Sequence, residues 1–322
     1  MNAIEKRIND LYAYSASLTP PADLAEYWDN AVSSARKHPH EGVREKLAWA
    51  SMPEAEVYRV TYYGFDDTPI RGWYLLPPGS SDKKLPCIVW FHGYHGSKGI
   101  PDDYAVYLMM GFAVFTVDVR GQGGETGNHL ASSTGMISGW ITQGILNKDE
   151  SYYKAITIDG LRAVDWASEQ PEIDAERIAI VGASQGGGLS LITSALSGKA
   201  AACVANVPNM CHMDYGMLYS TGSLTELARF ADVFPEHFPA IMETLSYFDI
   251  VNLADRLTMP LFMSVGLKDT ICMPETVFAA YNRIPSGAKH LEVYPFTGHT
   301  VNRHNNEQMR AFLRNQLTKP QG

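Results

Sequence analysis

A serine stands at the centre of the pentapeptide 182–186, Gly-Ala-Ser-Gln-Gly, which matches the pattern G-x-S-x-G. An apolar run at 177–181 precedes the pentapeptide, and a helix-forming stretch at 189–196 follows it. This order is typical of a sharp strand-to-helix turn, which exposes the serine hydroxyl above a sheet and directs a helix N-terminus toward it. The segment therefore predicts that Ser184 is a catalytic nucleophile rather than part of a plain glycine turn.

A serine hydroxyl is a weak nucleophile, so it needs an imidazole base and a carboxylate that orients the imidazole. In sheets of this kind the chain order is serine, acid, histidine. The histidines that come late enough are His290, His299 and His304. His290 precedes the expected strand 291–294 and His304 opens the last helix, whereas His299 lies in the loop after that strand. We therefore predict that His299 is the base.

The acid belongs in the loop after a late strand. The apolar strand predicted at 261–266 is followed by Leu267, Lys268 and Asp269. Asp214, Asp249 and Asp255 fall within a helical insertion, where surface or helix-capping carboxylates are the better interpretation. Asp269 is the predicted acid.

An oxyanion hole needs two backbone N–H groups. One is expected from Gln185, directly after the nucleophile, and the other from Tyr94 in the glycine-bearing loop 91–96. His92 and His95 in the same loop form an H-x-x-H pair, which is a weak metal signal because no third ligand and no helical H-E-x-x-H accompany it. We therefore expect no metal and no cofactor.

Arg120 and Gln122 stand among glycines in the segment 119–124, just after a predicted strand. The segment lacks the glycine patterns of phosphate-binding loops. We interpret both side chains as a structural brace that holds neighbouring loops by hydrogen bonds.

The elements that position these residues alternate between strands and helices. A hairpin at 56–62 and 70–76 comes first, and continuous apolar strands separated by helices follow it. Such an alternation predicts a mostly parallel, twisted sheet covered by helices on both faces, the α/β-hydrolase fold. The further strands are expected at 87–91, 113–117, 177–181, 201–207, 261–265 and 291–294, and helices at 24–37, 104–110, 158–168, 189–196, 274–282 and 305–316.

We expect residues 1–322 to form a single domain. Residues 1–50 read as an irregular start followed by a helix, a helical extension before the sheet. A glycine-rich connection spans 122–153, and a mainly helical insertion at about 209–255 precedes the acid-bearing strand. Insertions at strand ends commonly wall a binding site or form contacts between subunits.

The composition limits the kinds of partner that the protein can bind. A net charge of −9 and the lack of a basic cluster argue against nucleic acid and anionic membranes. No stretch approaches the roughly 18 apolar residues of a membrane span. The charged N-terminus does not resemble a signal peptide. The 4 cysteines show no C-x-x-C pairing, which favours reduced thiols. These features predict a soluble cytoplasmic protein.

In this order, these motifs resemble carbohydrate esterase family 7, the acetyl xylan esterases and cephalosporin C deacetylases. The resemblance covers nearly the whole chain, and its most specific part is Arg-Gly-Gln at 120–122 followed by Gly-x-Ser-Gln-Gly at 182–186. Further matches are the opening 21–28, the His-Gly-Tyr turn 92–94, and the segments 139–149, 244–255 and 277–282, together with His299.

The resemblance implies that Ser184, Asp269 and His299 form the catalytic triad, with Tyr94 and Gln185 at the oxyanion and substrate-contact positions. It also implies a homohexameric ring whose active sites face an internal cavity, which would admit small acetylated sugars and other small acetylated molecules. One position departs from the family pattern: Thr300 follows the histidine, where a glutamate is usual.

Two other functions fit the same residues less well. A peptidase or a broader acyl esterase could use the same fold, but no recognition domain precedes residue 50. A non-catalytic ligand binder on a decayed hydrolase fold would not need an intact nucleophile, acid and base. The expected function is a serine esterase that removes acetyl groups from acetylated xylo-oligosaccharides and small molecules such as cephalosporin C.

Overall fold

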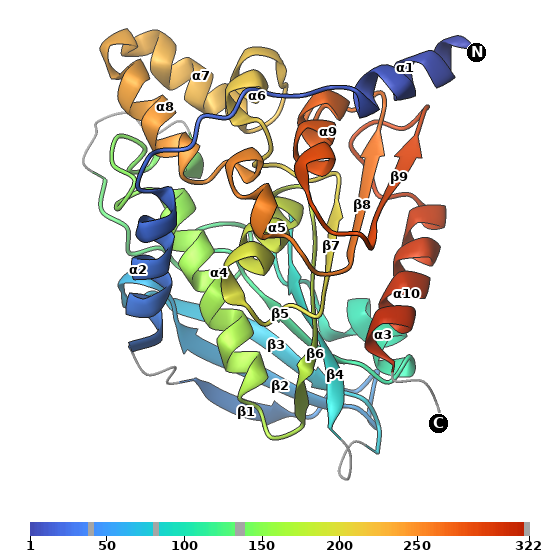
Figure 1. The fold of residues 1–322 in the computed structure, drawn as a ribbon. Helices are drawn as coiled ribbons and strands as arrows, with labels where there is room; N and C mark the ends of the chain where they lie inside the picture. Colours follow the sequence, from blue (N-terminus) through green and yellow to red (C-terminus); the bar gives the residue numbers. More distant parts are fainter. Residues whose placement is uncertain (38–41, 80–83, 133–138, 319–322) are drawn as a thin grey trace.

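The computed structural model describes residues 1–37, 42–79, 84–132 and 139–318. A nine-stranded sheet runs through its centre in the order β1-β2-β3-β5-β4-β6-β7-β8-β9 (Figure 1). The first three strands form an antiparallel edge, and from β5 to β9 every neighbouring pair is parallel. The predicted α/β-hydrolase fold, with its antiparallel hairpin and mostly parallel sheet, is confirmed.

The strands are β1 (Val43–Leu47), β2 (Glu56–Tyr63), β3 (Pro69–Leu76), β4 (Leu85–Phe91), β5 (Ala113–Val117), β6 (Ile173–Ala183), β7 (Ala202–Asn206), β8 (Leu261–Gly266) and β9 (Lys289–Tyr294). The α-helices are α1 (Ala3–Tyr12), α2 (Leu24–Lys37), α3 (Ala105–Met109), α4 (Tyr152–Ser168), α5 (Gln185–Ser197), α6 (Met213–Tyr219), α7 (Leu224–Val233), α8 (Phe238–Ser246), α9 (Pro274–Arg283) and α10 (Arg303–Leu317).

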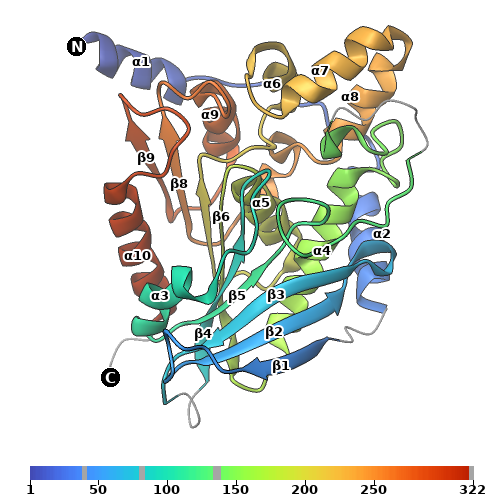
Figure 2. The same cartoon turned by 180° about the vertical axis from the view of Figure 1, so that it is seen from behind.

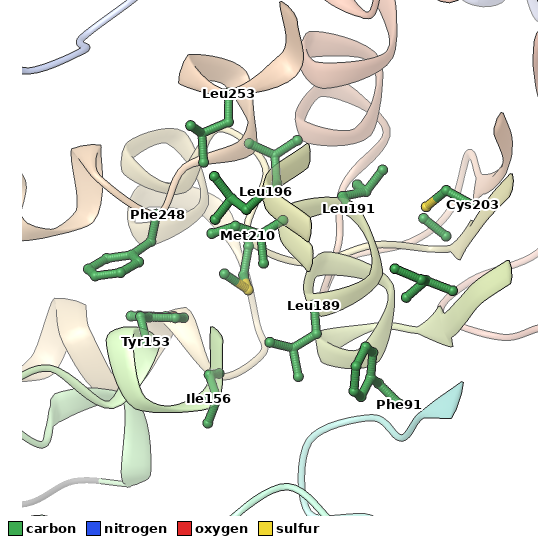
Figure 3. Packing of buried hydrophobic residues seen from close by; sticks show 14 of the residues in the cluster. Phe91, Tyr153, Ile156, Leu189, Leu191, Leu196, Cys203, Met210, Phe248 and Leu253 are labelled. Atoms are coloured by element: carbon green, nitrogen blue, oxygen red, sulfur yellow. The ribbon is translucent and has the colours of Figure 1, made fainter. Parts of the chain in front are cut away.

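Helices cover the sheet on both faces, which explains why β5, β7 and β8 are buried along their whole length. On one face, α2, α4, α5 and α9 pack in a large apolar cluster. On the other face, α3 and α10 pack against a smaller cluster (Figures 1 and 2). Close to α5, side chains from β4, α4 and the insertion surround Leu189 and its helix (Figure 3). This packing fixes the helix that begins at the predicted nucleophile.

Two elements near the N-terminus differ from the predicted irregular start. Residues Ala3–Tyr12 form α1, whose first turn is held by a capping box between Asn2 and Glu5. Residues Val43–Leu47 form an edge strand, where Arg44 makes two 2.9 Å hydrogen bonds to the Glu172 carboxylate. The first 50 residues are therefore an extension with helices and one strand, rather than a helical extension alone.

The predicted insertion contains α6, α7 and α8 between β7 and β8. These helices lie beyond the carboxyl ends of the parallel strands, at the top of Figure 1. In the glycine-rich connection at 122–153, residues 133–138 lie outside the described residues, and α4 begins within it at Tyr152. Across the described ranges, no helix has both the length and the apolar character required to cross a membrane.

Candidate active site

Ser184 lies at the turn between β6 and α5, in a conformation that few residues adopt. Its φ and ψ are 57° and −121°, and it directly precedes the first residue of α5. The turn leaves no room for a side chain at either glycine of the motif. A Cβ atom on Gly182 would lie 2.2 Å from the Gly186 carbonyl oxygen, and one on Gly186 would lie 2.1 Å from the Phe91 carbonyl oxygen. The glycines of the motif are therefore required by close backbone contacts, and the strain is concentrated at the serine.

The three residues predicted for the triad meet at the carboxyl ends of the strands. The Ser184 hydroxyl lies 2.9 Å from Nε2 of His299, and Nδ1 of the same ring lies 2.7 Å from Oδ2 of Asp269. Asp269 is buried, whereas Ser184 and His299 are partly exposed. A proton can therefore pass from the serine to the imidazole while the carboxylate orients the ring.

Backbone groups hold the Asp269 carboxylate in place. Its Oδ1 atom accepts hydrogen bonds from the N–H groups of Ile271 at 2.8 Å and Cys272 at 3.0 Å. Oδ2 is left to face His299, so the two oxygens have separate partners. This arrangement fixes which atom of the acid meets the imidazole.

The alternative acids and bases lie elsewhere. His290 is on β9 and pairs with Glu292, and His304 is in the first turn of α10. Asp214 pairs with His212, and Asp255 is exposed. Asp249 caps backbone N–H groups of His212, Met213 and Val251.

The backbone groups predicted for the oxyanion hole belong to two segments that flank Ser184. A Cβ atom on Gly93 would lie 3.6 Å from the Ser184 Cβ, so the turn at 93–96 passes directly beside the nucleophile. Among the described residues, the Tyr94 N–H has no hydrogen-bond partner. The Gln185 N–H is the first of α5 and has no partner within the helix. Within the described ranges, neither N–H group has a hydrogen-bond acceptor, so both can bind a negatively charged oxygen.

The Gln122 side chain connects these two segments. Its Oε1 accepts a hydrogen bond from the His95 N–H at 2.9 Å, and its Nε2 donates to Oε1 of Gln185 at 2.7 Å. Nε2 also lies 2.8 Å from the Tyr152 hydroxyl, which in turn donates to the Arg120 carbonyl. One amide thus bridges the 93–96 turn and the start of α5.

The Arg120 side chain is fully buried and anchors the 119–124 loop by hydrogen bonds. Its guanidinium makes two hydrogen bonds to the Asp159 carboxylate, at 2.7 and 2.8 Å, and a third to Asp66 at 2.9 Å. Burial opposes the charge, but the two carboxylates raise the pKa of Arg120 above its ordinary value. The residue is an ion-paired anchor between the 119–124 loop, α4 and the turn after β2.

The His92 ring connects two backbone segments, a role that its sequence position did not reveal. Its Nδ1 lies 2.8 Å from the Gly93 carbonyl oxygen, and its Nε2 accepts a hydrogen bond from the Val119 N–H at 2.8 Å. Burial lowers the pKa of His92, which favours the neutral ring that this pattern requires. Both ring nitrogens are engaged, and no group of metal-binding side chains occurs among the described residues.

Glu226 on α7 was not predicted from the sequence. Its Oε2 accepts a hydrogen bond from the Tyr94 hydroxyl at 2.8 Å, and the Trp140 N–H donates to the same hydroxyl at 3.1 Å. The insertion, the 93–96 turn and the connection before α4 therefore meet beside the predicted oxyanion segments. No local motif marks a lone glutamate on a surface helix, so only the fold reveals this contact.

Thr300 does not contribute to the hydrogen bonds of the histidine. Its side chain is exposed, and its N–H donates to the Gly298 carbonyl at 2.9 Å. His299 already uses both ring nitrogens toward Ser184 and Asp269. The departure from the usual glutamate therefore leaves the Ser184–His299–Asp269 geometry complete.

Comparison with known proteins gives consistent matches. The family model for acetyl xylan esterase (AXE1) matches residues 1–316. The acetyl xylan esterase from Paenibacillus sp. R4 is 34% identical with a TM-score of 0.92, and the alignment covers 96% of this chain and 99% of that one. Acetyl xylan esterase 1 from Thermoanaerobacterium sp. JW/SL YS485 is 29% identical with a TM-score of 0.90, over 96% and 98% of the two chains. The acetyl esterase Axe7A of Xylanibacter ruminicola is 26% identical over 313 residues, which are 92% of this chain and 67% of that protein.

The fold, the strained serine turn and these matches define a carboxylic ester hydrolase of the serine type on an α/β-hydrolase fold. The family model spans nearly the entire chain. The chain belongs to the acetyl xylan esterase family, as the motifs at 120–122 and 182–186 suggested.

Proposed function

We propose that the protein removes acetyl groups from acetylated xylo-oligosaccharides and from small acetylated molecules such as cephalosporin C. The observation that carries the proposal is the continuous hydrogen-bonded chain from the Ser184 hydroxyl through His299 to Asp269, within a chain of the acetyl xylan esterase family. The acetyl xylan esterases and the acetyl esterase among its relatives support the acetyl group and the sugar as the substrate class.

In this mechanism, Ser184 Oγ attacks the acetyl carbonyl carbon while Nε2 of His299 takes the hydroxyl proton. The carbonyl oxygen becomes an oxyanion, which the N–H groups of Tyr94 and Gln185 stabilise. The bond to the sugar oxygen then breaks, and His299 returns the proton to that oxygen. Water, deprotonated by His299, then attacks the acetyl-serine. His299 returns that proton to Ser184 Oγ as the acyl–oxygen bond breaks, so that one ester and one water yield one alcohol, one acetate and one proton.

Gln122 and Arg120 act as positioning residues in this proposal. Gln122 sets the distance between the two segments that carry the oxyanion N–H groups, because it bonds to one residue in each. Arg120 anchors the loop on which Gln122 stands through Asp159 and Asp66. Since the oxyanion hole must be in place before charge develops, such a brace supports catalysis without touching the substrate.

The oligomeric state and the cellular location that we propose follow from the resemblance to carbohydrate esterase family 7. The enzyme would assemble as a homohexamer in the cytoplasm, with its active sites facing an internal cavity that admits small substrates. A net charge of −9 is consistent with partners other than nucleic acid or anionic membranes.

The test is release of acetate from acetylated xylo-oligosaccharides by the wild type and by Ser184→Ala. The wild type should release acetate, and the variant should lose at least about a thousandfold in kcat, because the remaining oxyanion groups cannot replace the nucleophile. Wild-type turnover that persists in the variant would refute Ser184 as the nucleophile. Hydrolysis of p-nitrophenyl acetate without any release from the sugars would refute the substrate class alone.

A further inference from the structure

The carboxylate of Glu226 is held next to the predicted oxyanion segment without using all of its hydrogen-bonding capacity. Oε2 accepts the Tyr94 hydroxyl at 2.8 Å. Oε1 has no hydrogen-bond partner among the described residues. An ionised carboxylate has about four acceptor sites, and the described residues occupy one of those of Glu226. The side chain is also only half-buried.

The Glu226 carboxylate also lies directly beside Gly139. A Cβ atom on Gly139 would lie 1.9 Å from Oε2 and 2.5 Å from Oε1, so the carboxylate occupies the space that any other residue would fill. Gly139 also has a φ of 125°, a conformation that side chains rarely tolerate. The absence of a side chain at Gly139 therefore leaves room for the Glu226 carboxylate.

The start of α7 is tied to the nucleophile turn. The Asn209 N–H donates to the Ser184 carbonyl oxygen at 2.9 Å, and the Asn209 side-chain amide lies 3.4 Å from the Ser223 hydroxyl. Ser223 directly precedes α7. Glu226 is thus linked to the site from two directions, through Tyr94 beside the serine and through Asn209 behind it.

Aromatic rings stand beside the carboxylate. Tyr94 and Trp140 meet edge to face with 5.2 Å between ring centroids, and His95 lies 4.5 Å from Tyr94 and 4.9 Å from Trp140. The rings of Tyr94 and Trp140 are partly exposed, and that of His95 is exposed. Apolar ring surfaces next to a polar group of fixed position are a general arrangement for binding a ligand that is apolar on its C–H faces and polar at its hydroxyls.

We propose that Glu226 is a specificity-determining residue, whose carboxylate accepts a hydrogen bond from a free hydroxyl group of the sugar that carries the acetyl ester. This inference rests on the proposed function, because it concerns the alcohol part of the same substrate. A hydroxyl-to-carboxylate hydrogen bond is charge-assisted and about twice as strong as a neutral one. Glu226 therefore favours esters of polyhydroxy alcohols over esters of plain alcohols.

The test compares Glu226→Gln with the wild type on two acetyl esters, monoacetylated xylose and cyclohexyl acetate. The alcohol part of the second substrate is a ring of similar size without any free hydroxyl. Asp232→Asn is the matched control, because Asp232 is an exposed carboxylate on the same helix. We expect the ratio of kcat/KM for the sugar ester to kcat/KM for cyclohexyl acetate to fall about tenfold in Glu226→Gln, mainly through KM, and to stay unchanged in Asp232→Asn. Thermal denaturation of each variant checks that the fold is retained.

An equal loss on both esters in Glu226→Gln would overturn the inference, since it would show a general effect on the site. An unchanged ratio without any loss would overturn it as well. A wild type that hydrolyses cyclohexyl acetate but not the sugar ester would refute the proposed substrate, and with it the role of Glu226. A selective loss on the sugar ester, absent from the Asp232 control, is the supporting result.

Discussion

Replacement of Asp269 by asparagine is expected to disable the enzyme while leaving its fold intact. Oδ1 of Asp269 accepts two backbone N–H groups, at 2.8 and 3.0 Å, and Oδ2 faces Nδ1 of His299 at 2.7 Å. In Asp269→Asn the amide oxygen must stay at the Oδ1 position, because an NH₂ group there would face two donors, at a cost of about 1–3 kcal/mol for each unsatisfied group. The NH₂ group then points at His299.

An NH₂ group can only donate to Nδ1, which forces the imidazole proton onto Nε2. That nitrogen can then no longer accept the proton of Ser184. The same change of tautomer in the Ser-His-Asp proteases lowers kcat about 10⁴-fold, or about 5 kcal/mol of transition-state stabilisation. We expect a loss of this order in kcat with little change in KM, since Asp269 is buried and makes no contact with substrate in this mechanism.

The assay is steady-state hydrolysis of p-nitrophenyl acetate, with the unfolding transition measured in parallel. Asp255→Asn is the control, because Asp255 is exposed and lies on the insertion. It should stay within about twofold of the wild type, as expected for a surface change. If Asp269→Asn kept more than a tenth of the wild-type kcat, the tautomer argument would be refuted.

Three further predictions concern the residues around the triad. Gln122→Ala should lower kcat about tenfold, since the bridge between His95 and Gln185 is lost and the oxyanion N–H groups are less well fixed; kinetics with p-nitrophenyl acetate measure this. Arg120→Met should cost about 3–5 kcal/mol in the free energy of unfolding, because it leaves the buried Asp159 carboxylate without its partner; urea denaturation measures this. His92 should make the fold less stable in acid. Burial lowers its pKa, so its stabilising effect is complete above the unfolded value of about 6.5 and is lost as the pH falls through the lower folded value. The loss of unfolding free energy between pH 8 and pH 5 should therefore be smaller in His92→Asn than in the wild type.

A specific result would contradict each of these three predictions. A normal kcat in Gln122→Ala would mean that the two segments are fixed without the bridge. An unfolding free energy within about 1 kcal/mol of the wild type in Arg120→Met would show that Asp159 finds other partners or takes up a proton. If His92→Asn and the wild type lost the same unfolding free energy between pH 8 and pH 5, the pH dependence would belong to other groups.

The meeting of Ser184, Asp269 and His299 could be predicted from the sequence, because each residue follows the carboxyl end of a predicted strand. Ser184, Asp269 and His299 each follow a strand whose apolar or β-branched run is visible in the sequence. Parallel strands bring their carboxyl ends to one edge of the sheet, so loops far apart in the chain meet there. The order of the three residues then narrowed the choice among late histidines and aspartates.

Other features could not be predicted because they depend on contacts between distant segments. Glu226 lies on a helix of the insertion and reaches Tyr94 only in the folded chain. The sequence around Gln122 indicated a brace, but its partners Gln185 and His95 were not identifiable from spacing. The sequence marks His92 as part of a turn and of a weak H-x-x-H pair, but it does not reveal that the ring joins two backbone segments.

The missed elements near the N-terminus differ in how far the sequence could have revealed them. Helix α1 carries a local signal, Asn2 followed by Glu5, which is the spacing of a capping box. Strand β1 has none, because Val43–Leu47 is rich in charge and lies at the sheet edge, with an exposed or half-buried side chain at every position. Strand β1 is held in place by its pairing with β2 and by the hydrogen bond from Arg44 to Glu172, which lies 128 residues away in the sequence.

The most direct test of the mechanism is to trap the covalent intermediate. The wild type is mixed with p-nitrophenyl acetate, quenched in acid within the first turnovers, digested and analysed by mass spectrometry. We predict that the peptide containing Ser184 carries one added acetyl group, that the site of addition is Ser184, and that Ser184→Ala gives no acetylated peptide. An acetyl group on a different residue, or acetate production by Ser184→Ala at the wild-type rate, would contradict the assignment of Ser184 as the nucleophile.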